Sequence, residues 1–131
     1  MKILIVDDKA SIRSSMKTIL TELGFNDITE AVDGNDAWFK LKAEFQGKEP
    51  DVYDLIISDL EMPEMSGLDL LKAIRKDEKL KETPFIMVTA LNTKQVILET
   101  IKLGIKAYII KPFSTDSVKK KLIQTGFYKG K

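Results

Sequence analysis

Residues capable of phosphate chemistry follow four short apolar runs of this sequence. Asp7 and Asp8 follow "KILIV", Asp59 follows "LIIS", Thr89 ends "FIMVT", and Lys111 follows "AYII". Three carboxylates held close together repel one another, and a hard divalent ion such as Mg²⁺ relieves that repulsion. An aspartate can accept a phosphoryl group, and a lysine suits a phosphoryl oxygen. With the threonine hydroxyl as a further donor, these residue types predict a phosphoryl-transfer site.

Each of these residues also has a simpler structural interpretation. Asp8 could cap the helix expected after it, and Asp59 could stabilise a turn completed by Pro63 and Gly67. Thr89 alone is typical of a strand end, and a lone Lys111 is typical of an exposed side chain. Only their placement at one common edge of the fold favours the chemical interpretation.

Residues missing from the composition exclude other chemistry. The chain has no Cys and no His, which excludes disulfides, thiolate zinc sites and Ser-His-Asp catalysis. Phosphoryl transfer depends mainly on positioning and charge neutralisation, so it needs no histidine in this chain. The formal net charge of +1 gives no general attraction to nucleic acid or to anionic membranes. No apolar run approaches membrane-spanning length, and we expect a cytoplasmic protein.

The elements that must position these residues alternate regularly. Segments with helical spacing of apolar residues, such as Ile12, Met16, Ile19, Leu20 and Leu23, separate the strands predicted at 2–6, 28–32, 55–58, 85–89 and 107–110. Segment 45–53 is typical of a loop, and Ser114 or Thr115 is the expected N-cap of the last helix. Five βα units predict one α/β domain over residues 1–131, with a doubly wound parallel sheet covered by helices on both faces.

This architecture places the polar residues together. Ligands of open α/β sheets bind beyond the carboxyl ends of the strands, where the strand order reverses. Asp7, Asp8, Asp59, Thr89 and Lys111 all follow or end a predicted strand, so we expect them at that edge.

Four motifs in combination resemble the receiver domains of response regulators, most closely the stand-alone chemotaxis regulators of the CheY type. They are "IVDD" (5–8), "ISDLEMPEMSGLDLL" (57–71), "VTA" (88–90) and "YIIKPF" (108–113). The resemblance covers essentially residues 2–124, the expected core of the domain. It implies a flavodoxin-like three-layer sandwich of strand order 2-1-3-4-5.

The resemblance also implies roles for the acidic residues. Asp59 matches the phosphoacceptor, and Asp8 and Asp59 match the direct carboxylate ligands of Mg²⁺. Asp7 matches the residue that reaches the ion through water, and Glu61 the position that supplies a backbone carbonyl. The phosphoryl donor would be a histidine kinase.

Three further residues match the family's switch. Thr89 matches the hydroxyl that turns towards the phosphoryl group, Lys111 the lysine that contacts it, and Tyr108 the aromatic residue that changes rotamer. The expected output surface consists of the fourth helix, fifth strand and fifth helix. The Lys111–Pro112 bond is predicted to be cis, as a tight turn aiming Lys111 at Asp59 would need. Glu61 and Leu91 depart from residues common in the family at positions flanking the attacking water.

The implied function is a signalling switch rather than an enzyme. Its expected partners are a histidine kinase and a downstream protein, with the flagellar motor switch as one candidate, and neither nucleic acid nor membrane. Alternatives are a receiver cut from a longer regulator and an aspartyl-nucleophile phosphatase using "DLE" at 59–61. A flavin-binding protein is a weaker alternative, because the acidic "DDKASIRS" replaces the expected phosphate-binding loop.

Overall fold

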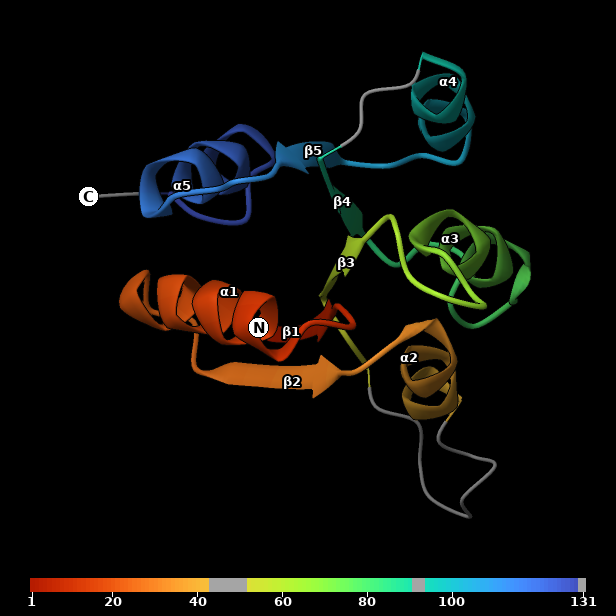
Figure 1. Cartoon of the computed structure of the whole chain (residues 1–131), viewed down its shortest axis with the longest axis horizontal. Coiled ribbons are helices and arrows are strands. Elements are labelled where there is room, and N and C mark those ends of the chain that lie inside the picture. The colour runs from red at the N-terminus through yellow and green to blue at the C-terminus, as the bar shows by residue number, and fades with distance from the viewer. Residues whose placement is uncertain (43–51, 91–93, 130–131) are drawn as a thin grey trace.

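Five strands alternate with five helices in the computed structural model, which describes residues 1–42, 52–90 and 94–129 (Figure 1). The strands are β1 (Lys2–Val6), β2 (Asp27–Ala31), β3 (Leu55–Asp59), β4 (Phe85–Thr89) and β5 (Ala107–Ile110). The helices are α1 (Ala10–Glu22), α2 (Gly34–Leu41), α3 (Gly67–Lys76), α4 (Lys94–Lys102) and α5 (Thr115–Gln124). Phe45 and most of the predicted loop at 45–53 lie outside the described residues.

The predicted sheet is confirmed. All neighbouring strands pair in parallel, in the order β2-β1-β3-β4-β5. Two strands differ from the prediction in their boundaries: β2 lies one residue earlier in the chain, and β3 extends one residue further, to Asp59. Asp59 pairs in register with Val88, and Thr89 with Ile110. The carboxyl ends of the central strands therefore lie at one edge of the sheet.

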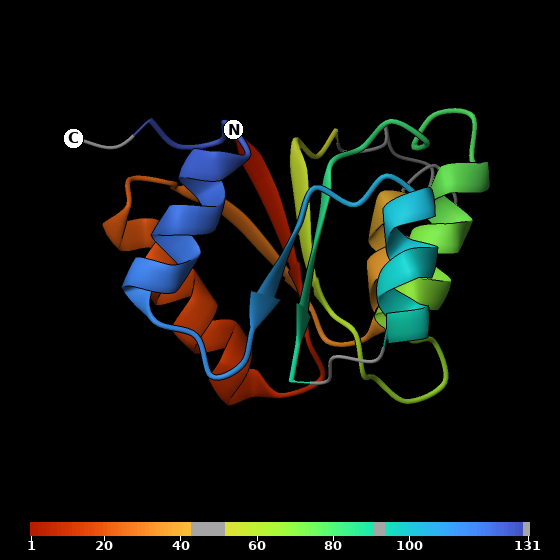
Figure 2. The same cartoon turned by 90° about the horizontal axis from the view of Figure 1, so that it is seen from above.

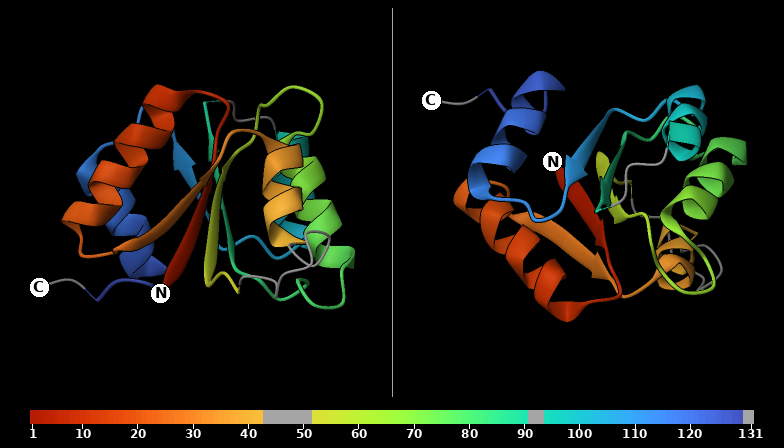
Figure 3. Two further views of the ribbon diagram at one scale, coloured as in Figure 1. Left: turned by 90° about the horizontal axis from the view of Figure 1, so that it is seen from below. Right: turned by 45° about the horizontal axis from the view of Figure 1, so that its top comes forward.

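The helices cover both faces of the sheet and complete the predicted three-layer sandwich. In Figure 2, the red α1 and blue α5 lie on one side of the strands, while α2, α3 and α4 lie on the other. Both views of Figure 3 show the same division. No helix within the described ranges is long and apolar enough to span a bilayer.

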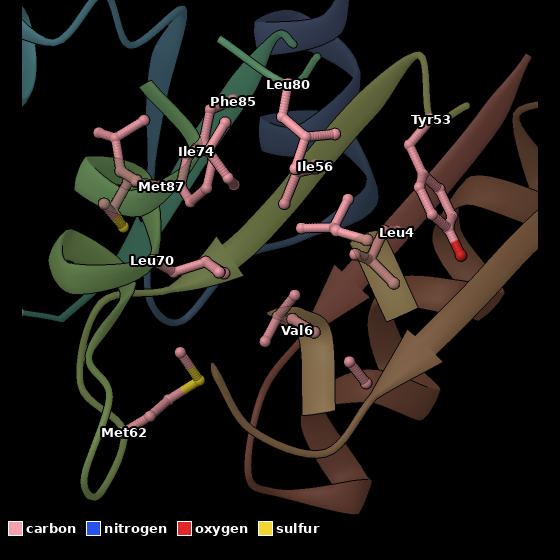
Figure 4. Packing of buried hydrophobic residues seen from close by; sticks show 14 of the residues in the cluster. Leu4, Val6, Tyr53, Ile56, Met62, Leu70, Ile74, Leu80, Phe85 and Met87 are labelled. Atoms are coloured by element: carbon pink, nitrogen blue, oxygen red, sulfur yellow. The ribbon is translucent and has the colours of Figure 1, made fainter. Parts of the chain in front are cut away.

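Alternation of side chains along the strands builds two separate cores. Leu4, Val6 and Ile56 belong to one cluster with Leu70 and Ile74 of α3, on the face of the sheet that α2, α3 and α4 cover (Figure 4). The residues between them in the strands pack against α1 and α5, in a cluster of Ile3, Ile5, Met16, Ile19, Leu20, Leu55, Ile57, Ile86, Val88, Ile109, Val118 and Leu122. Strands that are apolar on both sides are typical of parallel sheets, which explains the nearly unbroken apolar runs.

Among the helices whose N-caps lie in the described residues, α2, α3 and α5 begin with a side-chain cap and α1 does not. Asp33, Ser66 and Ser114 accept hydrogen bonds from backbone N–H groups of α2, α3 and α5. The N-cap of α1 is Lys9, which makes no side-chain cap hydrogen bond. The simple interpretation of Asp8 as a helix cap is therefore wrong, which leaves its carboxylate for another role.

The fourth helix buries little of its apolar surface. Thr100 is buried, whereas Ile101 is 58% exposed. Leu98 is also half exposed, so part of the apolar surface of α4 faces solvent.

Candidate functional site

Three carboxylates converge at the carboxyl edge of the sheet, as predicted. Asp7 follows β1, Asp8 comes next, and Asp59 ends β3. Each offers a carboxylate oxygen, and these oxygens lie within 4.8 Å of one another. Asp7 is 2% and Asp59 3% exposed, while Asp8 is open to solvent. Two buried carboxylates and one exposed carboxylate form a concentrated negative site with one open side.

Lys111 reaches into this site from the end of β5. Its Nζ lies 3.1 Å from an Asp59 oxygen and 3.4 Å from an Asp7 oxygen. The peptide bond between Lys111 and Pro112 is cis, which confirms the prediction. Burial disfavours the charged ammonium, but the hydrogen bond and charge of Asp59, together with Asp7, outweigh it and raise the pKa of Lys111. Lys111 is therefore held charged beside the two buried carboxylates.

The surroundings of Asp59 disfavour its ionised form. Burial of the carboxylate, followed by repulsion from Asp7, raises the pKa of Asp59 above the usual range. The hydrogen bond and charge of Lys111, and the charge of Lys9, act in the opposite direction without cancelling the effect. Lys111 thus offsets only part of the cost of an ionised Asp59.

The residues fit a magnesium ion. Mg²⁺ prefers oxygen ligands and uses one or two carboxylates with waters and phosphate oxygens. Asp8 and Asp59 provide such oxygens near each other, and Asp7 adds charge beside them. A divalent cation would also relieve the repulsion that raises the pKa of Asp59.

The other predicted residues occupy different parts of the site. Thr89 ends β4 as a buried residue, and its carbonyl accepts a hydrogen bond from the Lys111 N–H at 3.0 Å. Glu61 lies two residues beyond Asp59, with an exposed side chain. The metal-binding role of its carbonyl stays a prediction. Leu91 lies outside the described residues.

Tyr108 lies away from the carboxylates, on the face of the sheet covered by α4. Its ring packs against the core on that side and is partly buried. Its hydroxyl is hydrogen-bonded to the hydroxyl of Thr100 in α4. Thr100 Oγ1 in turn donates to the carbonyl of Ile97 at 2.8 Å, so it accepts from Tyr108.

Three contributing residues were not predicted from the sequence. The N–H of Lys9 donates to Asp7 Oδ1 at 2.9 Å, and its ammonium lies 3.6 Å from Asp8. Arg13 donates to the Asp7 carbonyl at 2.8 Å, and Thr100 binds Tyr108. The helical position of Arg13, one turn beyond Lys9, was a usable signal. No such signal was present for Thr100, because its hydrogen bond to Tyr108 joins two separate elements, α4 and β5.

Comparison with known proteins agrees with this geometry. The family described as "Response regulator receiver domain" matches residues 3–123. The chain is 42% identical over 122 residues to the chemotaxis protein CheY1 of Helicobacter pylori (strain 26695), covering 93% of this chain and 94% of that protein. It is 44% identical over 122 residues to the chemotaxis protein CheY-3 of Vibrio cholerae, covering 93% and 88%.

A solved structure supports the same assignment. The structure of the Vibrio cholerae chemotaxis response regulator CheY4 matches with a TM-score of 0.77 and 32% identity, over 95% of this chain and 97% of that one. Nothing in these comparisons favours the phosphatase or flavin-binding alternatives. Fold, site geometry and sequence likeness agree that the chain belongs to the response regulator receiver domain family, with CheY-type chemotaxis proteins among its relatives.

Proposed function

We propose that this chain is a phospho-accepting switch in which Asp59 receives a phosphoryl group from a histidine kinase. The observation that carries the proposal is the placement of Asp59, which is buried at a strand end between Asp7, Asp8 and the ammonium of Lys111. A buried carboxylate can accept a charged phosphoryl group when cations neutralise the added charge. Here the ammonium of Lys111 is one such cation, and the carboxylates could bind a metal ion as the second.

The proposed phosphoryl transfer uses one reacting group from each protein. An Asp59 carboxylate oxygen attacks the phosphorus of a phosphohistidine, an O–P bond forms, and the P–N bond to the kinase imidazole breaks. The product is an acyl phosphate on Asp59 and a free histidine on the kinase. Lys111 neutralises charge on the phosphoryl oxygens, and Asp8 and Asp59, with Asp7 through water and the Glu61 carbonyl, would hold Mg²⁺. Bound Mg²⁺ supplies further charge neutralisation.

Access for a donor is provided beside Lys111. A cavity of about 380 Å³ is lined by Ile12, Ser15, Ala90, Lys111, Pro112 and Phe113. It lies between the first two turns of α1 and the segment after β5. Its apolar lining suits a protein surface, and its lysine suits a phosphate, so we place the approach of the kinase there.

The signal would leave the site through Thr89 and Tyr108. A phosphoryl oxygen on Asp59 offers the Thr89 hydroxyl a new acceptor, and movement of that hydroxyl leaves space for the Tyr108 ring. The output surface would then be α4, β5 and α5, where Leu98, Ile101 and Ile110 are exposed. Exposed apolar side chains on adjacent elements suit a protein partner.

The names of the relatives support a proposal for the biological setting. Their names place them in chemotaxis, so we propose a cytoplasmic regulator whose output partner is a protein such as the flagellar motor switch. We propose a single receiver domain over residues 1–131, with its core at 2–124, that catalyses only its own phosphorylation and dephosphorylation. Neither nucleic acid nor membrane is expected as a partner.

Phosphorylation of Asp59 can be tested with acetyl phosphate and Mg²⁺. Intact-mass measurement should show one added phosphoryl group, labile to base as an acyl phosphate is. Asp59→Asn should acquire none, and labelling of this variant at the parent rate would place the acceptor elsewhere. Steady hydrolysis of an external phosphomonoester would instead favour the phosphatase alternative.

The metal assignment is tested by thermal unfolding. Millimolar Mg²⁺ should raise the Tm of the parent protein, because a ligand that binds only the folded state stabilises it. The increase should be much smaller for Asp8→Ala. Equal increases in both proteins would refute the assignment.

The switch is tested by NMR with beryllofluoride, which mimics a phosphoryl group. Thr89→Ala should still accept the group at Asp59 but lose most of the chemical-shift change around residues 91–108. A response equal to that of the parent would contradict the coupling.

A further inference from the structure

Arg13 connects the acidic turn after β1 to two neighbouring elements. It lies in the first turns of α1, and its side chain is only 14% exposed. Its Nη1 donates to the Asp7 carbonyl at 2.8 Å, and its Nε donates to Glu30 Oε1 of β2 at 3.1 Å. A planar guanidinium that binds one acceptor in the turn after β1 and another in β2 is held in one orientation. Arg13 thereby fixes the position of the Asp7 carbonyl relative to the sheet.

This contact matters because the backbone hydrogen bonds from α1 to this turn reach only Lys9, whose carbonyl accepts from the N–H groups of Ile12 and Arg13 at 3.1 Å. The helix has no side-chain N-cap and no acidic residue in its first turn. Within the turn, the Lys9 N–H donates to Asp7 Oδ1 at 2.9 Å. The Asp7 N–H donates to the Ala31 carbonyl at a longer 3.3 Å. The Arg13 side chain adds the contact that ties Asp7, at the start of this turn, to the body of the helix.

Asp8 depends on this arrangement more than Asp7 does. Asp7 is buried and bound through Lys9 and Lys111. Asp8 is solvent-exposed, and the ion pair recorded for its carboxylate is with the exposed ammonium of Lys9 at 3.6 Å. Exposed ion pairs fix a side chain weakly. The direction of the Asp8 carboxylate is therefore set mainly by the backbone on either side of it.

We propose that Arg13 is a positioning residue for the divalent-cation site, holding the Asp7–Lys9 turn so that the carboxylates of Asp8 and Asp59 converge. This inference rests on the proposed magnesium site. Partners that orient metal ligands are commonly worth a tenfold or larger factor in metal affinity, and Arg13 acts one step further away through the backbone. We expect its loss to weaken Mg²⁺ binding by about threefold to tenfold.

If Arg13 acted only through its charge, its removal should change the Mg²⁺ affinity in the opposite direction. Arg13 carries a positive charge near the site, so its removal should strengthen the binding of a divalent cation if charge alone mattered. Lys17 provides a matched control, because its ammonium lies 3.7 Å from the same Glu30 carboxylate. No contact between Lys17 and Asp7 accompanies this ion pair among the described residues. Lys17→Met therefore removes a charge of the same sign and a contact to Glu30 while leaving the turn intact.

The experiment compares Mg²⁺ titrations of the parent, Arg13→Met, Arg13→Lys and Lys17→Met. Binding is followed by the amide chemical shifts of residues 7–9 and 59 at constant ionic strength, at a temperature where thermal unfolding shows each protein folded. Arg13→Met should bind Mg²⁺ about threefold to tenfold more weakly, and Lys17→Met as tightly as the parent or slightly more tightly. Equal or tighter binding by Arg13→Met overturns the proposal, as does equal weakening in Lys17→Met.

Arg13→Lys keeps the experiment decisive if Arg13→Met does not fold. Lysine retains the charge, but its single nitrogen cannot bind the Asp7 carbonyl and Glu30 in the geometry of a guanidinium. It should weaken Mg²⁺ binding at least about twofold. Parent-like binding overturns the positioning role. A parent protein without saturable Mg²⁺ binding would overturn the metal site itself, whereas equal binding by parent and variant overturns only the role of Arg13.

Discussion

At the scale of single residues, the protein holds the carboxyl group of Asp59 where its ionised form is destabilised. Asp59 is buried beside Asp7, and Lys111 compensates only part of the resulting cost. This is a poor arrangement for stability and a suitable one for binding a divalent cation and accepting a phosphoryl group. The destabilised acid is evidence that the site is arranged for chemistry rather than for folding.

Asp59→Asn is therefore expected to stabilise the protein at neutral pH without Mg²⁺. Two like charges about 4 Å apart repel by roughly 4 kcal/mol at an effective dielectric constant of about 20, and Lys111 offsets part of this. A net gain of about 1 kcal/mol would raise the Tm by a few degrees for a domain of this size. Urea unfolding at pH 7 measures the gain, and a loss of stability would contradict the electrostatic account.

The pH dependence has a defined sign. Because the pKa of Asp59 is raised in the folded state, its contribution to stability is complete below the ordinary aspartate pKa. That contribution is lost as the pH rises through the raised value. The advantage of Asp59→Asn should consequently be large at pH 7 and disappear near pH 3, as unfolding curves at both pH values would show. An advantage independent of pH would indicate a packing effect instead.

At the scale of elements, α3 and the sheet approach each other too closely for a side chain at the first position of the helix. A Cβ added at Gly67 would lie 2.3 Å from the Asp59 carbonyl oxygen and 2.8 Å from Met87 Sδ. The Gly67 N–H also donates to the Leu60 carbonyl at 2.9 Å. The glycine lets the start of α3 lie directly against the strand end that carries Asp59.

Gly67→Ala should destabilise the protein by about 1–3 kcal/mol, because backbone must move to admit the methyl group. It should also slow labelling of Asp59 by acetyl phosphate, since the displaced backbone is that of Asp59 itself. Gly24→Ala is the control, because that position has a φ of +100° and no atom within 4 Å of an added Cβ. It should cost about 1 kcal/mol without affecting labelling. Labelling of Gly67→Ala at the parent rate would show that the close approach of α3 to Asp59 does not affect phosphorylation.

A second contact between elements joins β5 to α4 through the hydroxyls of Tyr108 and Thr100. The interaction lies beside the core, since Thr100 is buried and Tyr108 partly buried. Unfolding of Thr100→Val, Tyr108→Phe and the double variant should give a coupling energy of about 0.5–1.5 kcal/mol. Additive effects of the two substitutions would show that the hydroxyls do not stabilise each other.

At the scale of the whole molecule, one sheet separates two cores that share every strand. Leu20 of α1 is fully buried on one face, and Trp38 of α2 packs partly buried on the other. Because each strand contributes side chains to both faces, neither core can unfold while the other persists. The two faces should therefore behave as one cooperative unit.

Leu20→Ala tests this expectation. Truncation of a buried leucine typically costs about 2.7–5.0 kcal/mol. The loss should be the same whether unfolding is followed by Trp38 fluorescence on the opposite face or by circular dichroism of the whole chain. A smaller shift of the fluorescence transition would show that the two faces unfold separately.

The sequence by itself determined the local and periodic features of this protein. Five apolar runs, the helical stripes between them and the capping residue Ser114 depend on neighbours in the chain, so strand number, parallel class and layer arrangement could be predicted. The site residues could be predicted too, because parallel strands carry their carboxyl ends to one edge and each of these residues ends or follows a strand. The strand order came from the family resemblance, whereas the cis bond was predicted from the tight turn that would aim Lys111 at Asp59 and agreed with the resemblance.

Only the tertiary structure decided how residues distant in the chain act on one another. It showed that Asp8 does not cap α1, that Ile101 faces solvent, and that burial beside Asp7 raises the pKa of Asp59. It also brought Arg13 to the Asp7 carbonyl and Thr100 to Tyr108. Such effects depend on distances and solvent exclusion between separate elements, and these quantities are fixed only when helices pack against the sheet.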